Sequence, residues 1–214
     1  MRDRIESPDK GSEMCSLFLG VLSIPRVVER VDGFLVLPGE GEHWRLTEAI
    51  YWWQSEKSSA RSLLIAGHNT REKTSEILDL GRLQMKPYNL RRLEGVHLAI
   101  HAESTLDQMI WPCDKIKELD IKSIALFVSP YHQVRAYLTL LEALLARGYE
   151  VVLIPAPMLI PLDTVSPENG VDMWTLIPGE VSRIDRYQQE GCMVSLTKLK
   201  RYLGWLWQQP ILQR

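Results

Sequence analysis

The sequence predicts an α/β fold: a Rossmann-like, doubly wound three-layer sandwich with a mainly parallel sheet of about five strands and extra C-terminal helices. Two observations predict it. Short runs of apolar and β-branched residues recur five times along the chain, and helical patterns alternate with them. This alternation is typical of a parallel sheet covered on both faces by helices. Right-handed crossovers between its strands make such a sheet doubly wound.

Each element follows from a local pattern. The predicted strands are residues 33–37, 62–66, 96–100, 123–128 and 149–154. Apolar residues at helical spacing predict helices over residues 45–54, 74–80, 106–119, 137–146, 179–189 and 193–208. Pro112 should kink or restart the third of these helices, and Gly148 should end the fourth. We expect a loop with a short helix between residues 82 and 94.

The N-terminal region is expected to stand apart from the sheet. Residues 1–13 are polar and should fray, whereas residues 14–24 form an apolar run that predicts a short buried helix. The run is too short for the ~20 residues of a membrane span, and the acidic residues before it are unlike a signal peptide. We therefore expect a tail and short helix over residues 1–30, and a single Rossmann-like domain over residues 31–214.

Composition narrows the class of protein. The 214 residues carry a formal net charge of −2, which gives little electrostatic support for nucleic-acid binding. The three cysteines, Cys15, Cys113 and Cys192, are far apart and show no C-x-x-C spacing, so neither a disulfide framework nor a zinc site is expected. These features favour a soluble, cytoplasmic protein without a membrane span.

The loops after the strands carry the candidate site residues. The carboxyl ends of parallel strands meet at one edge of the sheet, where ligands of open α/β sheets bind. The candidate ligand-binding residues in these loops and at the following helix starts are Gly39, Glu40, Arg45, Gly67, His68, Asn69, Ser104, Thr105, Asp107, Gln108, Ser129, Tyr131 and Arg135. Four of the five histidines also fall there, whereas His97 lies within a strand and fits a buried core position.

Residues 129–136 are the most informative stretch. They place a hydroxyl, an imidazole and a guanidinium where a buried strand passes into a helix, and a helix start favours an anion. We interpret His132 as the candidate catalytic acid/base or hydrogen-bond donor. A Ser129–His132 nucleophile pair is disfavoured, because no G-x-S-x-G surrounds the serine and Pro130 lacks an N–H. Arg135 lies one turn beyond Tyr131, which indicates an anion clamp.

Structural interpretations remain open beside these. The glycine loop at residues 38–41 is also compatible with a simple tight turn, and residues 67–70 with a loop that caps the next helix. Ser104 or Thr105 is a plausible N-cap, with Asp107 or Gln108 in a capping box.

Two further alternatives concern metals and subunits. A metal site built from the loop histidines lacks the H-x-x-x-H spacing that would make it strong, so no metal ligand is assigned. The seven tryptophans predict core packing, but two adjacent pairs or near-pairs, Trp52 with Trp53 and Trp205 with Trp207, leave a subunit interface as the alternative.

At these residues the chain resembles the bacterial SanA/YdcF-like family, whose domain has no settled reaction. A first strand ends in a Gly-rich turn and is followed by an arginine, as in residues 34–41 and Arg45. Residues 104–108 are similar to the family's Asn-Thr-x-Glu-Asn stretch, and residues 129–136 match its Thr/Ser-x-x-His-x-x-Arg-Ala motif. Further correspondences are residues 66–68 with Glu76, and Glu180 with Arg183.

The resemblance covers about residues 32–154 and extends through the correspondence of Glu180 and Arg183 to residue 190. It implies a Rossmann-like fold with a small-molecule site at the strand ends, and one soluble relative binds S-adenosylmethionine. The cofactor of this chain is left unknown. Our leading hypothesis is a protein that binds a small anionic or nucleotide-like molecule, either as a binding protein or as an enzyme acting on a phosphorylated or nucleotide-linked substrate. The alternatives are a non-catalytic sensor or scaffold, which would be a homo-oligomer through its tryptophans, and a metal-dependent hydrolase. A lid over the site is expected from residues 155–178.

Overall fold

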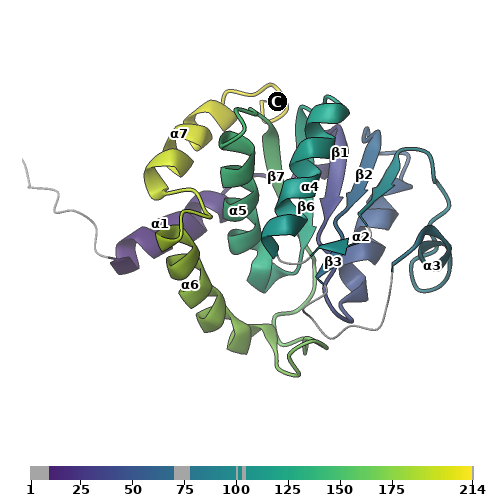
Figure 1. Cartoon of the computed structure of the whole chain (residues 1–214), viewed down its shortest axis with the longest axis horizontal. Helices are drawn as coiled ribbons and strands as arrows, with labels where there is room; N and C mark the ends of the chain where they lie inside the picture. The colour runs from purple at the N-terminus through teal and green to yellow at the C-terminus, as the bar shows by residue number, and fades with distance from the viewer. Residues whose placement is uncertain (1–9, 70–77, 100, 103–104, 214) are drawn as a thin grey trace, which may run out of the picture.

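The computed structural model describes residues 10–69, 78–99, 101–102 and 105–213. It confirms the α/β, Rossmann-like fold: a five-stranded, all-parallel sheet with helices on both faces (Figure 1). The strands are β1 (Gly33–Val36), β2 (Ser62–Ile65), β4 (Val96–Leu98), β6 (Ser123–Val128) and β7 (Val152–Pro157). Their spatial order is β4-β2-β1-β6-β7. The chain first builds the sheet from β1 through β2 to the edge at β4. It then returns to the other side of β1 and adds β6 and β7. Ligand crevices of doubly wound sheets lie at this reversal.

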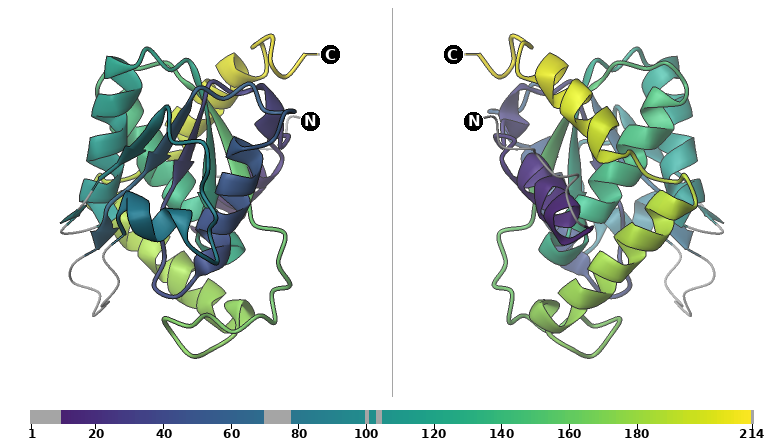
Figure 2. Two further views of the ribbon diagram at one scale, coloured as in Figure 1. Left: turned by 90° about the vertical axis from the view of Figure 1, so that its right-hand side faces the viewer. Right: turned by 90° about the vertical axis from the view of Figure 1, so that its left-hand side faces the viewer.

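Seven helices are present in the described residues. They are α1 (Lys10–Leu22), α2 (His43–Trp53), α3 (Leu80–Gln84), α4 (Thr105–Glu118), α5 (Gln133–Leu145), α6 (Met173–Gln189) and α7 (Leu196–Leu206). Figure 2 shows α4 and α5 on one face of the sheet and α2 on the other. Two short 3₁₀ helices, η1 (Val28–Arg30) and η2 (Pro130–His132), and a small parallel sheet of β3 (His68–Asn69) and β5 (His101–Ala102) complete the fold.

The core lies between the sheet and these helices. All four residues of β1 and all six of β6 are buried, because both strands are central and are covered on two faces. Phe34 packs edge-on against Phe127 and Trp53. The central strands are therefore fixed by apolar packing on both sides, and the loops that follow them start from rigid positions.

The helix after β6 differs from its prediction. Residues 137–146 were expected to form an amphipathic helix, but α5 already begins at Gln133, and all its residues except Glu142 and Leu145 are buried. It contacts α1, α4, α6 and two strands, so no face of it is left for water. A helix surrounded in this way shows no polar stripe, which explains why the amphipathic pattern predicted its start poorly.

The last strand is also shifted from its prediction. The expected strand at residues 149–154 is wrong by three residues, since β7 pairs Val152 with Ser123 and continues to Pro157. Tyr149 instead donates its N–H to the carbonyl of Leu144 at the end of α5. β7 accommodates Pro155 and Pro157 because it is an edge strand, where a missing N–H costs no ladder bond on the open side.

Two helices contain a proline, and one of these prolines, Pro112, was expected to kink or restart its helix. Pro112 lies inside α4, which runs without a break from Thr105 to Glu118. α6 was predicted to begin at residue 179 but begins at Met173, where the Asp172 side chain caps it by accepting from the N–H of Thr175. Pro178 therefore lies inside α6. Gly148 follows the end of α5 as predicted, with a positive φ of 71°.

The N-terminal helix is buried along one face only. The expected short helix is present and buries Leu17 and Val21, whereas Leu19 is 69% exposed. α1 packs on α5 and α7, and Gly20 lets Leu199 approach closely. The predicted helix at residues 74–80 lies mostly outside the described residues; α3 is the short helix expected in the following loop, two residues earlier than expected.

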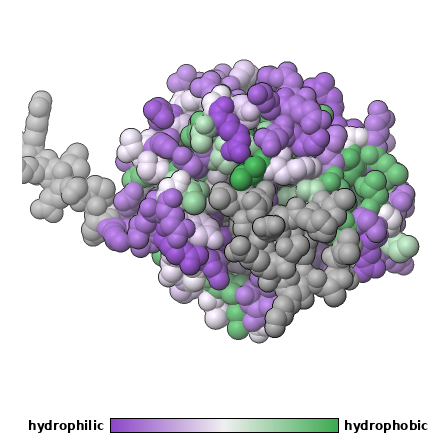
Figure 3. Space-filling view, in the orientation of Figure 1, coloured by the Kyte–Doolittle hydropathy of each residue, from purple (hydrophilic) through white to green (hydrophobic). Residues whose placement is uncertain are grey.

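The tryptophans divide between core and surface. Trp53 is fully buried, and Trp52 is half-buried and donates to Glu48. Trp205 is half-buried against Tyr202, while Trp207 is 46% exposed. The molecular face in Figure 3 is largely hydrophilic where α6 and α7 cover it. Among the described residues, no helix has both the length and the apolar character needed to cross a membrane.

Candidate functional site

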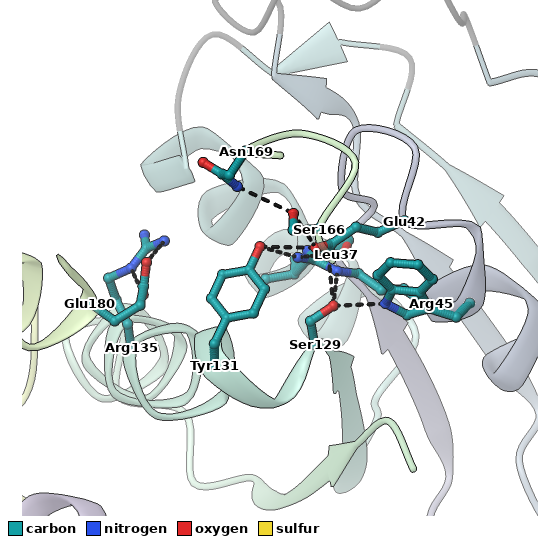
Figure 4. Close-up of polar contacts among 10 residues, drawn as sticks. Leu37, Glu42, Arg45, Ser129, Tyr131, Arg135, Ser166, Asn169 and Glu180 are labelled. Carbon is teal, nitrogen blue, oxygen red and sulfur yellow. Dashed lines mark hydrogen bonds and ion pairs between the residues drawn. The ribbon is translucent and has the colours of Figure 1, made fainter. Parts of the chain in front are cut away.

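A polar cavity of about 160 Å³ lies at the carboxyl edge of the sheet, where the strand order reverses between β1 and β6. One wall comes from the strand ends and the helices that follow them, and the other comes from α6 and the segment before it. Its lining residues are Pro38, Gly39, Arg45, Gln108, Tyr131, His132, Arg135, Glu168, Asn169, Leu176, Glu180, Arg183 and Tyr187. Two buried ion pairs stand on either side of Tyr131 in this region (Figure 4).

The first ion pair joins Glu42 and Arg45 at the start of α2. Both side chains are almost completely buried. Glu42 also accepts hydrogen bonds from Ser129 (2.7 Å), Tyr131 (3.1 Å) and Ser166 (2.9 Å), while Arg45 donates to the carbonyl of Leu37 (3.1 Å) (Figure 4). A buried charge pair is stable only when its remaining polar atoms are satisfied in this way. The pair therefore fastens the β1 loop, η2 and the segment after β7 to one another.

Ser129 belongs to this network. Its hydroxyl donates to Glu42 and accepts from the indole N–H of Trp44 and from Nε of Arg45, both at 2.9 Å. A serine hydroxyl has one proton and two lone pairs, so these three bonds use its whole hydrogen-bonding capacity. Ser129 is thus a positioning residue behind the cavity, which agrees with the interpretation that it is not a nucleophile.

Gly39 is required by the ion pair as well as by the cavity it lines. A Cβ atom at this position would lie 2.7 Å from Cζ of Arg45 and 2.8 Å from a carboxylate oxygen of Glu42. The space in front of this glycine is therefore filled by the chain's own charged groups. Tyr131 lies beside them, and burial raises the pKa of its hydroxyl well above the ordinary value, so it remains protonated and donates to Glu42.

The second ion pair holds Arg135 to Glu180 on α6. Nε and Nη2 of Arg135 donate to the two carboxylate oxygens, at 2.5 and 3.2 Å. Arg183, one turn further along α6, adds a third bond to the same carboxylate at 2.6 Å. Glu180 is 1% exposed and Arg135 is 8% exposed. Arg135, which was expected to clamp an anionic ligand, is thus bonded in this structure to a carboxylate of the protein itself.

His132 is the buried, incompletely bonded group of the cavity. It is 7% exposed, and its Nε2 has no hydrogen-bond partner among the described residues. Burial, together with the positive charges of Arg135, Arg45 and Arg183, holds its pKa well below the ordinary value of 6.5. The imidazole is therefore neutral at pH 7, with one nitrogen able to accept or donate according to its tautomer.

We expect His132 to make stability depend on pH below 6.5. The unfolded chain takes up a proton on this imidazole near its ordinary pKa, whereas the folded chain resists it. The stabilisation is therefore complete above pH 6.5 and is lost as the pH falls towards the folded pKa, by up to about 1.4 kcal/mol per pH unit. Urea unfolding between pH 7 and 5 should show that the free energy of unfolding changes less with pH in H132Q than in the wild type.

His97 provides the control for this measurement. It is half-buried on β4, and burial followed by the charge of Lys115 lowers its pKa. H97Q should change the dependence of the free energy of unfolding on pH less than H132Q does. If the free energy of unfolding changed equally with pH in H132Q and in the wild type, the fold would not hold His132 neutral.

The predicted site residues fall into four groups. Those that line the cavity are Gly39, Arg45, Gln108, Tyr131, His132 and Arg135. Ser129 lies directly behind it, and the side chain of Gln108 donates to the carbonyl of Gly67 at 2.7 Å, which fastens the β2 loop to α4. Glu40 is half-buried, and Glu42 is the carboxylate that enters the site in its place. The structure places the backbones of His68 and Asn69 in β3 and of Thr105 and Asp107 in α4, while Ser104 lies outside the described residues.

Several lining residues were not predicted. Glu168, Asn169, Leu176 and Tyr187 belong to α6 and to residues 158–172, a segment that crosses the carboxyl edge of the sheet in Figure 2. The ion pair of Glu42 and Arg45 was not predicted either, although their spacing of three residues at a helix start is a sequence signal that could have indicated it. A lid over the site was expected from residues 155–178, and Glu168, Asn169 and Leu176 of that stretch line the cavity, but no local signal indicated which of its side chains would do so.

His43 contacts a residue outside the lining of the cavity. His43 shares a short contact of 2.6 Å between its Nδ1 and the hydroxyl of Tyr88. Within the described residues, His132 is the one histidine that lines the cavity, and no cluster of three or more His, Cys, Asp or Glu side chains has the arrangement of a metal site.

No protein-family model matches the chain, and no curated protein sequence matches it. Function is therefore inferred from the geometry of the site. Three arginines, a neutral buried imidazole and a protonated tyrosine around a small polar cavity can bind an anion and can exchange a proton with it.

Proposed function

We propose that this chain binds a small anionic or nucleotide-like molecule in the cavity at the carboxyl edge of its sheet. The observation that carries the proposal is the position of three arginines and a buried imidazole with a free nitrogen, all in one cavity at the reversal of strand order. An unsatisfied buried polar atom is costly, so its presence in a cavity points to a ligand that completes it.

The size of the cavity limits what is enclosed. A volume of about 160 Å³ is close to cavities that hold one small ring, whereas sites for drug-sized molecules are typically ~300 Å³ or more. The enclosed part therefore suits an anionic head group. The remainder of a nucleotide-like ligand would extend out of it.

We further propose that the chain is an enzyme acting on a phosphorylated or nucleotide-linked substrate, with His132 as the acid/base group. The imidazole is neutral at pH 7, and the negative charge of a bound phosphoryl group would counter the arginine charges that lower its pKa, which favours transfer of a proton to it. The motif of residues 129–136 supports a relationship to the SanA/YdcF-like family. The three cysteines form no disulfide, which supports a cytoplasmic location.

Thermal unfolding with inorganic phosphate, adenosine monophosphate, glucose 6-phosphate and S-adenosylmethionine tests the binding proposal. A ligand at 100 times its Kd should stabilise the wild type by about 2.7 kcal/mol. R183A removes an arginine whose side chain is 45% exposed, so the fold should survive, and affinity should fall at least about tenfold because one charge-assisted hydrogen bond is lost.

R201A is the matched control, because Arg201 is exposed on α7 and lies outside the lining of the cavity. It should bind as the wild type does. Equal binding by R183A and R201A would place the ligand elsewhere. Loss of turnover in H132Q with retained binding would support the enzyme; retained turnover would show that the imidazole has no catalytic role.

A further inference from the structure

Two arginines of the cavity converge on one internal carboxylate. Arg135 approaches Glu180 from α5 with two N–H groups, and Arg183 approaches it from α6 with a third. Figure 4 shows the guanidinium of Arg135 side by side with the carboxylate, away from the Glu42 network. All three residues line the cavity together with His132. Glu180 thus occupies the part of the cavity where an anionic ligand would find its strongest partners.

The charges of this cluster do not balance. Arg135 and Arg183 contribute two positive charges, while Glu180 supplies one negative charge that is almost completely buried. Glu168 also lines the cavity from an exposed position, and its negative charge acts there, because it helps to raise the pKa of Tyr131. Arg45 is neutralised by Glu42. The cluster of Arg135, Arg183 and Glu180 by itself therefore carries one net positive charge beside the neutral imidazole of His132.

We infer that the ligand of this cavity carries a phosphoryl group, and that this group takes the place of the Glu180 carboxylate on Arg135 and Arg183. The inference rests on the proposed function and specifies its ligand. A phosphoryl group offers three peripheral oxygens and up to two negative charges. It matches the two N–H groups of Arg135 and the one of Arg183, and it neutralises both arginines. A carboxylate ligand offers one charge fewer.

His132 favours the same group. Its Nε2 lies in a buried side chain of the same cavity and has no hydrogen-bond partner in the described part of the chain. A phosphoryl group that uses its oxygens on the arginines still has lone pairs, or a proton in its monoanionic form, for one more hydrogen bond. The imidazole nitrogen can meet either through its choice of tautomer.

The backbone of α6 near Glu180 allows the carboxylate to move away from Arg135 and Arg183. Pro178 lies two residues before it in α6 and has no N–H, so the helix lacks one hydrogen bond there. Gly179 lies between the two, and the nearest atom to a Cβ at that position would be 3.7 Å away, so the backbone is not tightly packed. The turn before Glu180 therefore lacks one backbone hydrogen bond, and the Glu180 carboxylate can leave the arginines by rotating towards solvent.

Isothermal titration with inorganic phosphate at constant ionic strength tests the inference. E180Q removes the competing charge and keeps the side-chain shape, so it should bind phosphate at least tenfold more tightly than the wild type. D185N is the matched control, because Asp185 lies on the same helix, is half exposed and pairs with Lys10. It should bind as the wild type does. Equal or weaker binding by E180Q would overturn the inference.

Two further variants guard against misfolding and non-specific effects. E180D keeps the charge but shortens the side chain, and should show a smaller gain in affinity if Glu180 competes. Should E180Q be unfolded without ligand, phosphate should refold it at concentrations where chloride does not; failure to do so, with no gain in E180D, overturns the inference. In the double variant E180Q/R183A the gain should disappear.

Glycerol phosphate and adenosine monophosphate separate free phosphate from phosphoesters. A larger gain for either ester than for phosphate identifies an ester as the ligand, and a gain confined to phosphate identifies the free ion. One result would remove the inference but leave the proposed function standing. In that result R183A abolishes binding of the nucleotide, whereas E180Q binds both the nucleotide and phosphate as the wild type does. No binding of any probe to any variant would remove both.

Discussion

Replacing Glu42 with glutamine is expected to lower the free energy of unfolding by about 3 to 5 kcal/mol, because it leaves the buried guanidinium of Arg45 without a counter-ion. Glu42 is 1% exposed and accepts from three hydroxyl groups in addition to its ion pair. The amide of glutamine has one acceptor oxygen in place of two. The effect should be measured by urea unfolding at pH 7.

Glu48 supplies the matched control for this variant. It lies on the same helix, pairs with Arg26 at 2.8 Å and accepts from Trp52, but both members of the pair are partly exposed. Exposed pairs contribute little, so E48Q should cost less than about 1 kcal/mol. If E42Q were as stable as E48Q, the Glu42 network would not be what fastens the loops of the site.

Replacing Arg135 with methionine is expected to cost about 3 to 5 kcal/mol of stability and to abolish ligand binding. Methionine retains the apolar stem, so the loss reports the charge rather than the packing. Without Arg135, the carboxylate of Glu180 remains buried with Arg183 alone. Removing one partner of a buried pair is strongly destabilising. Urea unfolding gives the stability, and calorimetry with phosphate gives the binding.

A double variant separates the two roles of Arg135. Replacing a buried ion pair with apolar residues is often neutral, so R135M/E180L should recover most of the stability lost in R135M. It should not recover binding. R186M is the control, since Arg186 and Glu190 are both more than half exposed, and it should leave both properties near those of the wild type. A stable R135M, or an R135M that binds phosphate normally, would contradict the assignment.

The sheet could be predicted from the sequence because its signals are local. β6 was predicted with its observed bounds, since the apolar run of residues 123–128 ends in Ser129-Pro130. The start of β7 could not be predicted in this way. The apolar run begins at residue 149, but pairing with β6 decides where the strand starts. The burial of α5 on all sides likewise depends on neighbours that no local pattern specifies.

Half of the candidate site was predicted for the same reason. Tyr131, His132 and Arg135 lie together in the chain at a strand end, and the fold rule places strand ends at one edge. The partners of the site were missed because they come from distant segments: Ser166 reaches Glu42 across 124 positions of the sequence. Glu40 and Glu42 both follow Gly39 closely, and only the backbone of the loop decides which one turns inward.

The most direct test of the account follows the imidazole signals of His132 by NMR while inorganic phosphate is added at pH 7.5 and constant ionic strength. We predict that these signals shift along a saturable curve with the Kd found by calorimetry, while those of His97 on β4 stay in place. Saturable binding that moves other signals but leaves His132 unchanged would contradict a ligand site in the cavity at the carboxyl edge.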